Sequence, residues 1–419
     1  MRRGDHDPAA VAAAAAAASQ GRPRVAPAPG VARWDGCVID DLPRDLLLRV
    51  LSLLGARQLV RTCAVAPRWR DLWRDTPCIN ALRDEFELLE DCDSKFQRFV
   101  NRLLMLRNPT ELDQFRLWYA INPLEVDAYC AEANLWIGHA LLCNARSVEV
   151  SAWHKDGTIL LELDPGVFTS QNLTTLSLSW CRLTSGFFGR LRTGCVVLEH
   201  LSLQNCFIAG AEISCQTLKF LEISVDCYFT SDKQVTISVP SLVHLGFFGC
   251  VEGRIPSLEN MESLLTASVA LGCFSAIDTQ VDDILVQDVC RFLQRLSGVT
   301  ELDFYFEEIT LKVENNLQWC PEFNNLTVLT LGRWCLHADF YALIVFLQNS
   351  PNLVKLILNL EKRFYVRGRI MGELEERSFT CQHLKIVEIV CMEHDSTVDS
   401  LKKFLLESGI TSCQIVIKN

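Results

Sequence analysis

The sequence of 419 residues contains no long apolar segment and none of the short motifs that mark common enzyme sites. No stretch approaches about eighteen uninterrupted apolar residues of aliphatic character, so we expect no membrane span. There is no Gly-Lys dipeptide, which excludes a nucleotide-binding P-loop, and neither G-x-S-x-G nor H-E-x-x-H occurs. Carboxylates are plentiful but single out no catalytic pair. We therefore expect no catalytic residues, no cofactor and no metal.

Positive charge is in deficit, with 40 Lys and Arg residues against 51 Asp and Glu residues and a net charge of −11. The deficit is unevenly distributed along the chain. Residues 1–36 and residues 37–80 each carry +2, which leaves −15 on everything after residue 80. A surface of that sign repels phosphates, so we expect no nucleic-acid partner.

Closely spaced cysteine pairs are also missing, although the chain holds 19 cysteines. Their number is odd, they are spread over nearly the whole sequence, and no two lie within eight positions of each other. This spacing excludes C-x-x-C metal and redox pairs, and a chain of this length needs no disulfide scaffold. The cysteines therefore predict reduced, buried thiols in a cytoplasmic and/or nuclear protein.

The first 36 residues are rich in alanine and proline, with an uninterrupted alanine run at 12–18. A signal peptide is one interpretation, because Arg2 and Arg3 precede the alanines. Asp5 and Asp7 interrupt the charged region, however, and alanine is only weakly hydrophobic. We favour a disordered leader over 1–36.

Residues 37–80 predict three short helices. In the first, over 42–54, apolar residues recur at the i, i+4, i+8 spacing of a helix, and Gly55 ends it. The second and third follow at about 57–63 and 67–74. Three helices of this length cannot bury all of their Leu, Val and Trp side chains among themselves. Part of that apolar surface is therefore expected to bind another protein.

This stretch resembles the F-box, particularly its plant form. The resemblance rests on Leu42-Pro43, on the leucine run after them, and on Arg68-Trp69-Arg70 with Leu72-Trp73. Gly55-Ala56 departs from the usual Leu-Pro, and Ala66-Pro67 departs from the usual Ser with a basic residue. An ordinary helical subdomain packed on the rest of the chain is the alternative. The resemblance implies binding to a Skp-type adaptor and, through it, to a cullin. The adaptor contacts would be Leu42, Pro43, Leu46, Leu47, Val50, Val60, Val65, Trp69 and Trp73.

Residues 81–142 predict a mainly helical connector between the F-box-like segment and the C-terminal two thirds of the chain. One amphipathic face ends near Asn108-Pro109, and a short strand is expected at 115–118. The apolar residues of the amphipathic face are Phe96, Phe99, Val100, Leu103 and Leu104.

Residues 143–370 predict a solenoid built from a repeat, and one further copy of the same pattern follows them. The pattern L-x-x-L-x-L, with Ile, Val or Phe at some positions, recurs at intervals of mostly 20 to 31 residues. Its copies begin at Leu173, Leu198, Leu218, Leu242, Val299, Leu326, Leu353 and Leu384. Alternating apolar residues predict short strands, and the recurrence predicts successive coils of a solenoid. A doubly wound α/β domain is the alternative, but its helices should be longer than these spacings allow.

The repeat resembles the irregular leucine-rich repeat of plant F-box proteins, which places an inward-turning Asn or Cys about eight residues after the first Leu. Six cysteines fall at that offset or one residue later: Cys181, Cys206, Cys250, Cys227, Cys273 and Cys335. We expect them to pack rather than to react, because a catalytic thiol needs a nearby base and a lowered pKa.

Residues 371–419 predict a strand, a helix and a strand. They resemble the FBD segment that ends many plant F-box/leucine-rich-repeat proteins. Such a segment would cap the last coil, whose core would otherwise face water.

In each L-x-x-L-x-L strand, the residues beside the second and third leucine point away from the core. We expect them to form the surface that binds a substrate. The residues predicted to contact substrate are His200, Phe220, Glu222, His244, Phe248, Glu301, Asp303, Tyr305 and Lys355.

The fold class expected from these features is α+β, an α/β solenoid with a three-helix F-box before it and an FBD-like cap after it. The resemblance implies a non-catalytic substrate-recognition subunit of a Skp–cullin–F-box ubiquitin ligase, which raises the effective concentration of an unknown protein substrate near the transfer machinery. The alternative is a leucine-rich-repeat interaction scaffold that does not engage a ligase. A hydrolase that uses one of the cysteines is a third hypothesis, which the missing motifs disfavour.

Overall fold

The computed structural model describes most of the chain, and the predicted leader at 1–36 lies outside the described residues. The described residues are 39, 42–65, 67–120, 125–153, 160–224, 227–230, 234–250, 255–272, 283–307, 310–312, 319–361, 369–372, 374, 376–379, 382–392, 395 and 397–418. The chain divides into two units, Met1–Pro43 and Arg44–Asn419, and the second contains the sheets and helices of the fold.

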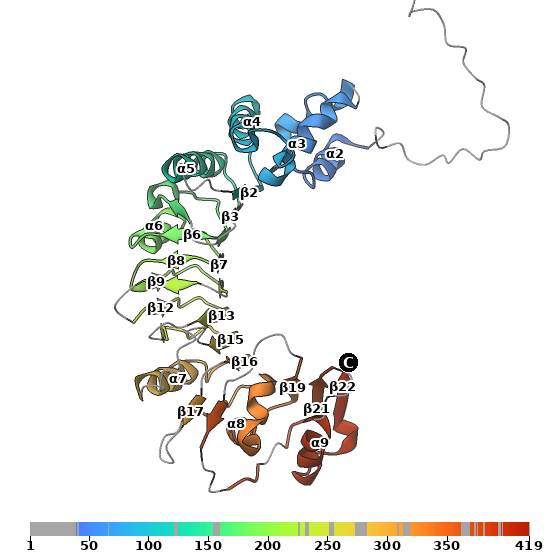
Figure 1. Ribbon diagram of the computed structural model, residues 1–419, viewed down its shortest axis with the longest axis vertical. Coiled ribbons are helices and arrows are strands. Elements are labelled where there is room, and N and C mark those ends of the chain that lie inside the picture. The colour runs from blue at the N-terminus through green and yellow to red at the C-terminus, as the bar shows by residue number, and fades with distance from the viewer. Residues whose placement is uncertain are drawn as a thin grey trace, which may run out of the picture. The chain divides into compact units, whose positions relative to one another are not determined.

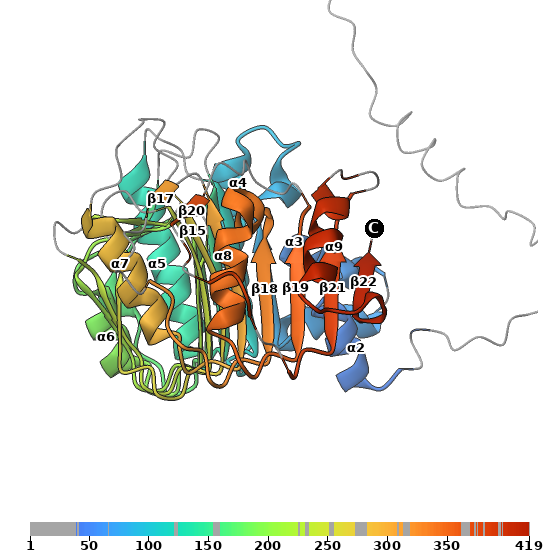
Figure 2. The same cartoon turned by 90° about the horizontal axis from the view of Figure 1, so that it is seen from below.

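One 13-stranded parallel sheet runs through the second unit. Its strands, in order across the sheet, are β1 (Cys78–Leu82), β2 (Gln114–Ala120), β3 (Ser147–Trp153), β5 (Thr175–Ser179), β7 (His200–Gln204), β10 (Phe220–Ile223), β13 (His244–Cys250), β15 (Thr266–Gly272), β16 (Glu301–Glu307), β18 (Val328–Gly332), β19 (Lys355–Asn359), β21 (Ile386–Val390) and β22 (Ile415–Lys418). Spatial order follows chain order, so each coil adds one strand beside the last. Figure 2 shows β18, β19, β21 and β22 side by side in this order.

Shorter strands form the second side of several coils. They make a sheet of β11 (Tyr228–Phe229), β8 (Phe207–Ile208), β6 (Cys181–Leu183) and β4 (Leu161–Leu163), a sheet of β14 (Ser257–Glu259), β12 (Thr236–Ser238) and β9 (Glu212–Ser214), and a pair of β17 (Thr310–Lys312) and β20 (Arg369–Met371). Trp180 (φ 59°) and Asn205 (φ 50°) adopt the left-handed conformation where β5 and β7 end, and there the chain turns into β6 and β8.

Helices are the other elements of the coils, and some coils contain both a short strand and a helix. The helices are α4 (Cys92–Leu106), α5 (Val126–Leu142), α6 (Phe187–Gly194), α7 (Asp283–Arg295), α8 (His337–Gln348) and α9 (Thr397–Glu407), with the 3₁₀-helices η6 (Arg83–Phe86), η7 (Pro165–Val167), η8 (Arg333–Leu336) and η9 (Ser412–Gln414). Figure 1 shows α5, α6 and α7 on one side of the strands β3 to β16. None of the helices in the described ranges is long and apolar enough to cross a membrane.

The core lies between the main sheet and these helices and short strands. The second and third leucines of the repeats, such as Leu176, Leu178, Leu201 and Leu203, are at most 3% exposed and form rows across the sheet. The alternating pattern of burial continues from strand to strand. The solenoid predicted from the repeat is therefore confirmed, and the doubly wound alternative is not the fold of this chain.

The short strand predicted at 115–118 of the connector is confirmed, and it is longer than expected. Besides α4 and α5 the connector thus supplies β2, whose register pairs Phe115 with Val148 of β3. β1, at the end of the F-box-like segment, pairs with β2 in the same way. The first coils of the sheet thus begin before residue 143, while the boundaries proposed between F-box, connector, solenoid and cap stay a prediction.

The F-box-like segment consists of α2 (Arg44–Leu51), α3 (Ala56–Arg61), and the 3₁₀-helices η3 (Thr62–Ala64), η4 (Pro67–Trp69) and η5 (Leu72–Asp75). The third predicted helix is thus present as two 3₁₀-helices rather than one α-helix. Asp71 between them has φ −114° and ψ 1°, outside the α-helical region, which interrupts the i→i+4 bonding series. Asn80 Nδ2 donates to the carbonyls of Ser52 and Leu54, each at 2.9 Å, and so ties the end of α2 to β1.

In the C-terminal part of the chain, an ion pair and hydrogen bonds connect η8 to the start of α9. The Arg333 guanidinium pairs with the Asp395 carboxylate and donates to the Leu360 carbonyl at 2.8 Å. Asp395 in turn accepts from the Thr397 backbone N–H at 3.0 Å, at the first residue of α9. This network joins the segment predicted as an FBD-like cap to the coil before it.

Candidate protein-interaction surfaces

Apolar side chains are exposed on the F-box-like helices. Leu46 and Val50 are 45% and 41% exposed on one side of α2, and Leu53 continues that side beyond the helix end. Val65, in the turn after η3, is also exposed. We call Leu46, Val50, Leu53 and Val65 the N-terminal apolar surface. Exposed apolar side chains on so short a helical segment are typical of a protein-binding site.

Except for Pro43, the other predicted adaptor contacts are buried or partly buried. Leu47 and Trp69 are 0% and 5% exposed, so they stabilise the packing of the helices and are not accessible to a partner. Val60 and Trp73 are partly buried against the core. Leu42 is half-buried and Pro43 is exposed, and both belong to the first unit. The helical periodicity alone could not separate the inward from the outward positions.

The departure from the F-box pattern at Gly55 has a structural counterpart. Glu85, in η6, accepts from the backbone N–H groups of Arg57 at 2.9 Å and Gln58 at 3.1 Å, and so caps α3. A Cβ on Gly55 would lie 2.5 Å from Cδ of Glu85. Because Gly55 has no side chain, the Glu85 carboxylate can occupy the space beside it. Burial raises the pKa of Glu85, against the effect of these hydrogen bonds.

The main sheet has a second face, which α5, α6 and α7 do not cover (Figure 1). Outward side chains of neighbouring strands stand in register on it. We call this the open face. The structure places on it all the residues predicted to contact substrate: His200, Phe220, Glu222, His244, Phe248, Glu301, Asp303, Tyr305 and Lys355.

One row of the open face contains stacked rings. His200 and Phe220 lie face to face on β7 and β10, with ring centroids 4.4 Å apart and an interplanar angle of 4°. Phe220 also contacts His244 of β13 at 6.2 Å between centroids, and Nδ1 of His244 lies 2.7 Å from Oγ1 of Thr266 on β15. The row is a continuous contact across four strands, yet Phe220 is still 39% exposed.

The next rows contain Glu222, Phe248, Asp303 and Tyr305. Gly246 stands between Glu222 and the Phe248 ring, and a Cβ there would lie 3.1 Å from Cγ of Glu222. These positions were predictable from the repeat register, but the stacking and the glycine gap were not.

The charges at the two ends of the open face are paired. Arg116 Nε lies 2.7 Å from Glu149 Oε2 near the first strands. Near the last strands, Glu388 pairs with Lys355 at 3.0 Å and Lys418 at 3.1 Å, and the hydrogen bond from Lys355 is the main cause of its lowered pKa. The Lys355 ammonium group, which was predicted to contact substrate, is therefore already paired with a carboxylate of this chain.

Three carboxylates in the middle of the open face differ from these paired charges at its ends. Glu222, Glu301 and Asp303 form no ion pair with any residue in the described ranges, and Glu222 has only a 3.5 Å contact from the Ser202 hydroxyl. The outward positions of the described strands from β7 to β16 include no Lys or Arg. The centre of the open face is therefore acidic.

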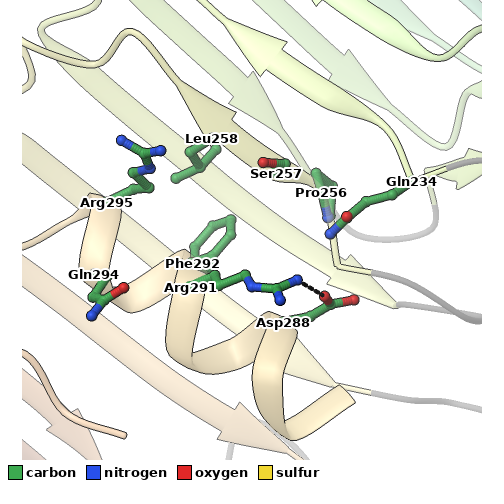
Figure 3. A pocket seen from close by; sticks show the side chains of 9 residues that line it. All are labelled: Gln234, Pro256, Ser257, Leu258, Asp288, Arg291, Phe292, Gln294 and Arg295. Carbon is green, nitrogen blue, oxygen red and sulfur yellow. Dashed lines mark ion pairs between the residues drawn. The ribbon is translucent and has the colours of Figure 1, made fainter. Parts of the chain in front are cut away.

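A pocket of about 450 Å³ lies away from these surfaces, between β14 and α7 (Figure 3). Arg291 reaches toward the buried Asp288, with 3.9 Å between Nη1 and Oδ1. Arg295 borders the same pocket, while Leu258 and Phe292 make part of it apolar. In the described ranges, no group of three or more His, Cys, Asp and Glu residues is placed to hold a metal ion.

Four of the six repeat cysteines are described, and all four are buried: Cys181, Cys206, Cys227 and Cys335. The Cys250 side chain and Cys273 lie outside the described part of the chain. The backbone N–H of Cys206 lies 3.4 Å from Sγ of Cys227, and Sγ of Cys206 lies 3.4 Å from the Leu178 carbonyl oxygen. Burial raises the pKa of the Cys181 and Cys335 thiols, which is the reverse of what a nucleophilic cysteine requires, whereas hydrogen bonds with Cys181 and Cys227 lower the pKa of the Cys206 thiol. Cys206 is itself fully buried, so its thiol is not accessible to a substrate.

A helical unit with an exposed apolar surface, followed by a parallel-strand solenoid of leucine-based coils, is the architecture of F-box/leucine-rich-repeat proteins. Comparison with known families supports both parts. A family described as "F-box domain" matches residues 39–79, and one described as "At1g61320/AtMIF1, LRR domain" matches residues 161–408. The chain belongs to the plant F-box/leucine-rich-repeat family.

Individual relatives agree with this assignment. The chain is 27% identical to the MEIOTIC F-BOX protein MOF of Oryza sativa subsp. japonica, over 88% of its own length and 83% of the relative's. It is 24% identical to the putative F-box/LRR-repeat protein At3g59160 of Arabidopsis thaliana, over 90% and 95%. It is 25% identical to the FBD-associated F-box protein At1g66310 of the same plant, over 76% of each chain. Proteins of this family are generally non-catalytic adaptors whose F-box binds a Skp-type protein and whose repeats bind substrate.

Proposed function

We propose that this chain is the substrate-recognition subunit of a Skp–cullin–F-box ubiquitin ligase, acting in the cytoplasm, the nucleus or both. The N-terminal apolar surface would bind the Skp-type adaptor, together with Leu42 and Pro43. The open face would bind a protein substrate. The chain would make and break no covalent bond, and would work by holding substrate near the transfer machinery.

The observation that carries this proposal is the exposure of Leu46 and Val50 on α2. Exposed aliphatic side chains on a rigid helix are typical anchors of an interface, and such anchors contribute about 2 kcal/mol or more each when a partner buries them. The alternative, a scaffold that engages no ligase, predicts no adaptor binding at these residues.

Co-purification of the full chain with a Skp-type adaptor tests the proposal. We expect Leu46→Ala with Val50→Ala to weaken adaptor binding by about tenfold or more. Both side chains are exposed, so thermal unfolding of the chain should shift little.

A matched control is Met105→Ala with Leu106→Ala, which removes two exposed apolar side chains from α4 outside the F-box. This variant should retain full adaptor binding. Equal capture of both variants, or no capture of the unmodified chain, would instead favour the scaffold.

A further inference from the structure

We infer that the centre of the open face binds an extended, arginine-containing segment of the substrate. This inference rests on the proposed function, because it names the class of partner for the same surface. Its basis is a contrast between the paired charges at the two ends of the open face and three carboxylates at its centre, which pair with no cation of the described residues. These carboxylates are Glu222, Glu301 and Asp303.

The sign of the partner follows from charge complementarity. The chain carries −15 after residue 80, and the described outward positions between β7 and β16 contribute no Lys or Arg to offset the carboxylates. Bringing an acidic segment to this face would place like charges together, whereas a cationic segment would pair with them. Long-range attraction between opposite charges would also speed the encounter.

Arginine fits the apolar surroundings better than a compact ammonium group does. Glu222 is two residues from Phe220 on β10, and the exposed part of that ring offers a contact for the aliphatic stem of an arginine. The guanidinium can then pair with the carboxylate through two hydrogen bonds. Phe248 and Tyr305, in the row on the other side of the carboxylates, offer similar contacts.

The spacing of the carboxylates sets the spacing of the arginines. Glu222 and Asp303 stand in one row, on β10 and β16, with β13 and β15 between them. Three steps of about 4.8 Å between strands give roughly 14 Å. Side chains four residues apart on one side of an extended chain are roughly 13 Å apart. A segment that crosses the strands with arginines at i and i+4 would therefore reach both carboxylates.

Fluorescence anisotropy with labelled peptides tests the inference on the full chain, and adaptor binding is measured separately. The first probe is Thr-Arg-Thr-Thr-Thr-Arg-Thr. The comparison probes have the same composition with adjacent arginines, citrulline in place of both arginines, or glutamate in place of both. We expect the first probe to bind best, the citrulline peptide to bind about tenfold or more weakly, and the glutamate peptide not to bind. Added salt should weaken the first interaction.

Variants locate the site. Glu222→Gln with Asp303→Asn should lower affinity for the first probe by about tenfold or more. Glu212→Gln is a matched control, because Glu212 is an exposed carboxylate on β9, outside the main sheet. It should leave binding unchanged. A preference for the acidic or citrulline peptide, no preference between the two arginine spacings, or undiminished binding by the double variant would overturn the inference.

The same variants should bind the adaptor as the unmodified chain does, since the open face and α2 are separate parts of the molecule. If the unmodified chain did not bind the adaptor, that result would count against the proposed function alone. Loss of peptide selectivity with adaptor binding intact would count against the partner class alone.

Discussion

At the scale of single residues, the contact between Gly55 and Glu85 shows how one position can depend on another far along the chain. The Glu85 carboxylate caps α3 from 28 residues away. A side chain at position 55 would occupy the same space. Gly55 has φ −62° and ψ 150°, which any residue adopts, so the requirement for glycine comes from space and not from backbone strain.

We predict that Gly55→Ala and Glu85→Ala are not additive. Glu85→Ala alone should cost about 1 kcal/mol of unfolding free energy through loss of the cap. Gly55→Ala alone displaces the carboxylate and loses the same cap, but restricts the unfolded chain, so its net effect should lie near zero. Once Glu85 is absent, Gly55→Ala should stabilise by up to about 1 kcal/mol.

A double-mutant cycle by urea unfolding measures this coupling. Asp84→Ala serves as the control, because Asp84 is exposed and neighbours Glu85. Its effect should add to that of Gly55→Ala. Additive behaviour of Glu85→Ala would show that the cap does not depend on the space beside Gly55.

At the scale of elements, the repeat made most of the fold predictable, because the alternating leucines fix both the strands and their inward faces. The eight copies of the repeat coincide with β5, β7, β10, β13, β16, β18, β19 and β21, and the outward positions on the open face follow from the same pattern. The features that could not be predicted came from contacts between distant segments. No local sequence pattern predicts that Glu85 caps α3, or that Leu46 of α2 is exposed while Leu47 is buried.

Some short elements outside the repeat, such as β1, were harder to predict for the same reason. β1 has only five residues and joins the sheet because β2 pairs with it along its length. Likewise, η4 and η5 replace a regular helix because Asp71 leaves the helical conformation between them. Tertiary contacts decide such short elements, and propensity does not.

The Arg333–Asp395 pair is the element-scale link whose pH dependence can be predicted. The hydrogen bond from Arg333 holds the pKa of Asp395 well below its usual range. A carboxyl with a depressed folded-state pKa contributes stability above its unfolded-state pKa of about 3.9, and that contribution is lost as the pH falls toward the folded-state value. Asp395→Asn should therefore cost about 2 kcal/mol at pH 7, and the difference from the unmodified chain should shrink below about pH 4.

Urea unfolding at several pH values between about 7 and 3 checks this expectation. Glu407→Gln is the comparison, because Glu407 pairs with Lys403 on the exposed side of α9 at 3.8 Å. It should change stability by less than about 0.5 kcal/mol at every pH. A cost for Asp395→Asn that did not vary with pH would indicate lost packing rather than a lost charge.

At the scale of the whole molecule, successive coils share one core, so their stability is a sum of intrinsic and nearest-neighbour terms. The rates at which the native cysteine thiols react can measure this coupling between coils without any substitution. Cys181, Cys206 and Cys227 occupy neighbouring positions of three coils, next to the paired residues of β6, β8 and β11. All three are buried, whereas Cys413 is exposed near the end of the chain.

We predict that pulse labelling of the native chain with N-ethylmaleimide modifies Cys413 before the buried Cys181, Cys206 and Cys227. Cys181, Cys206 and Cys227 should react much later and with one common rate, because burial blocks access and neighbouring coils open together. Mass spectrometry resolves the residues, and labelling in urea, where all four should react alike, is the control. Labelling of Cys206 as fast as Cys413 would mean that the coils do not bury their thiols. Three different rates would mean that each coil opens by itself, so that the open face is not held as one surface.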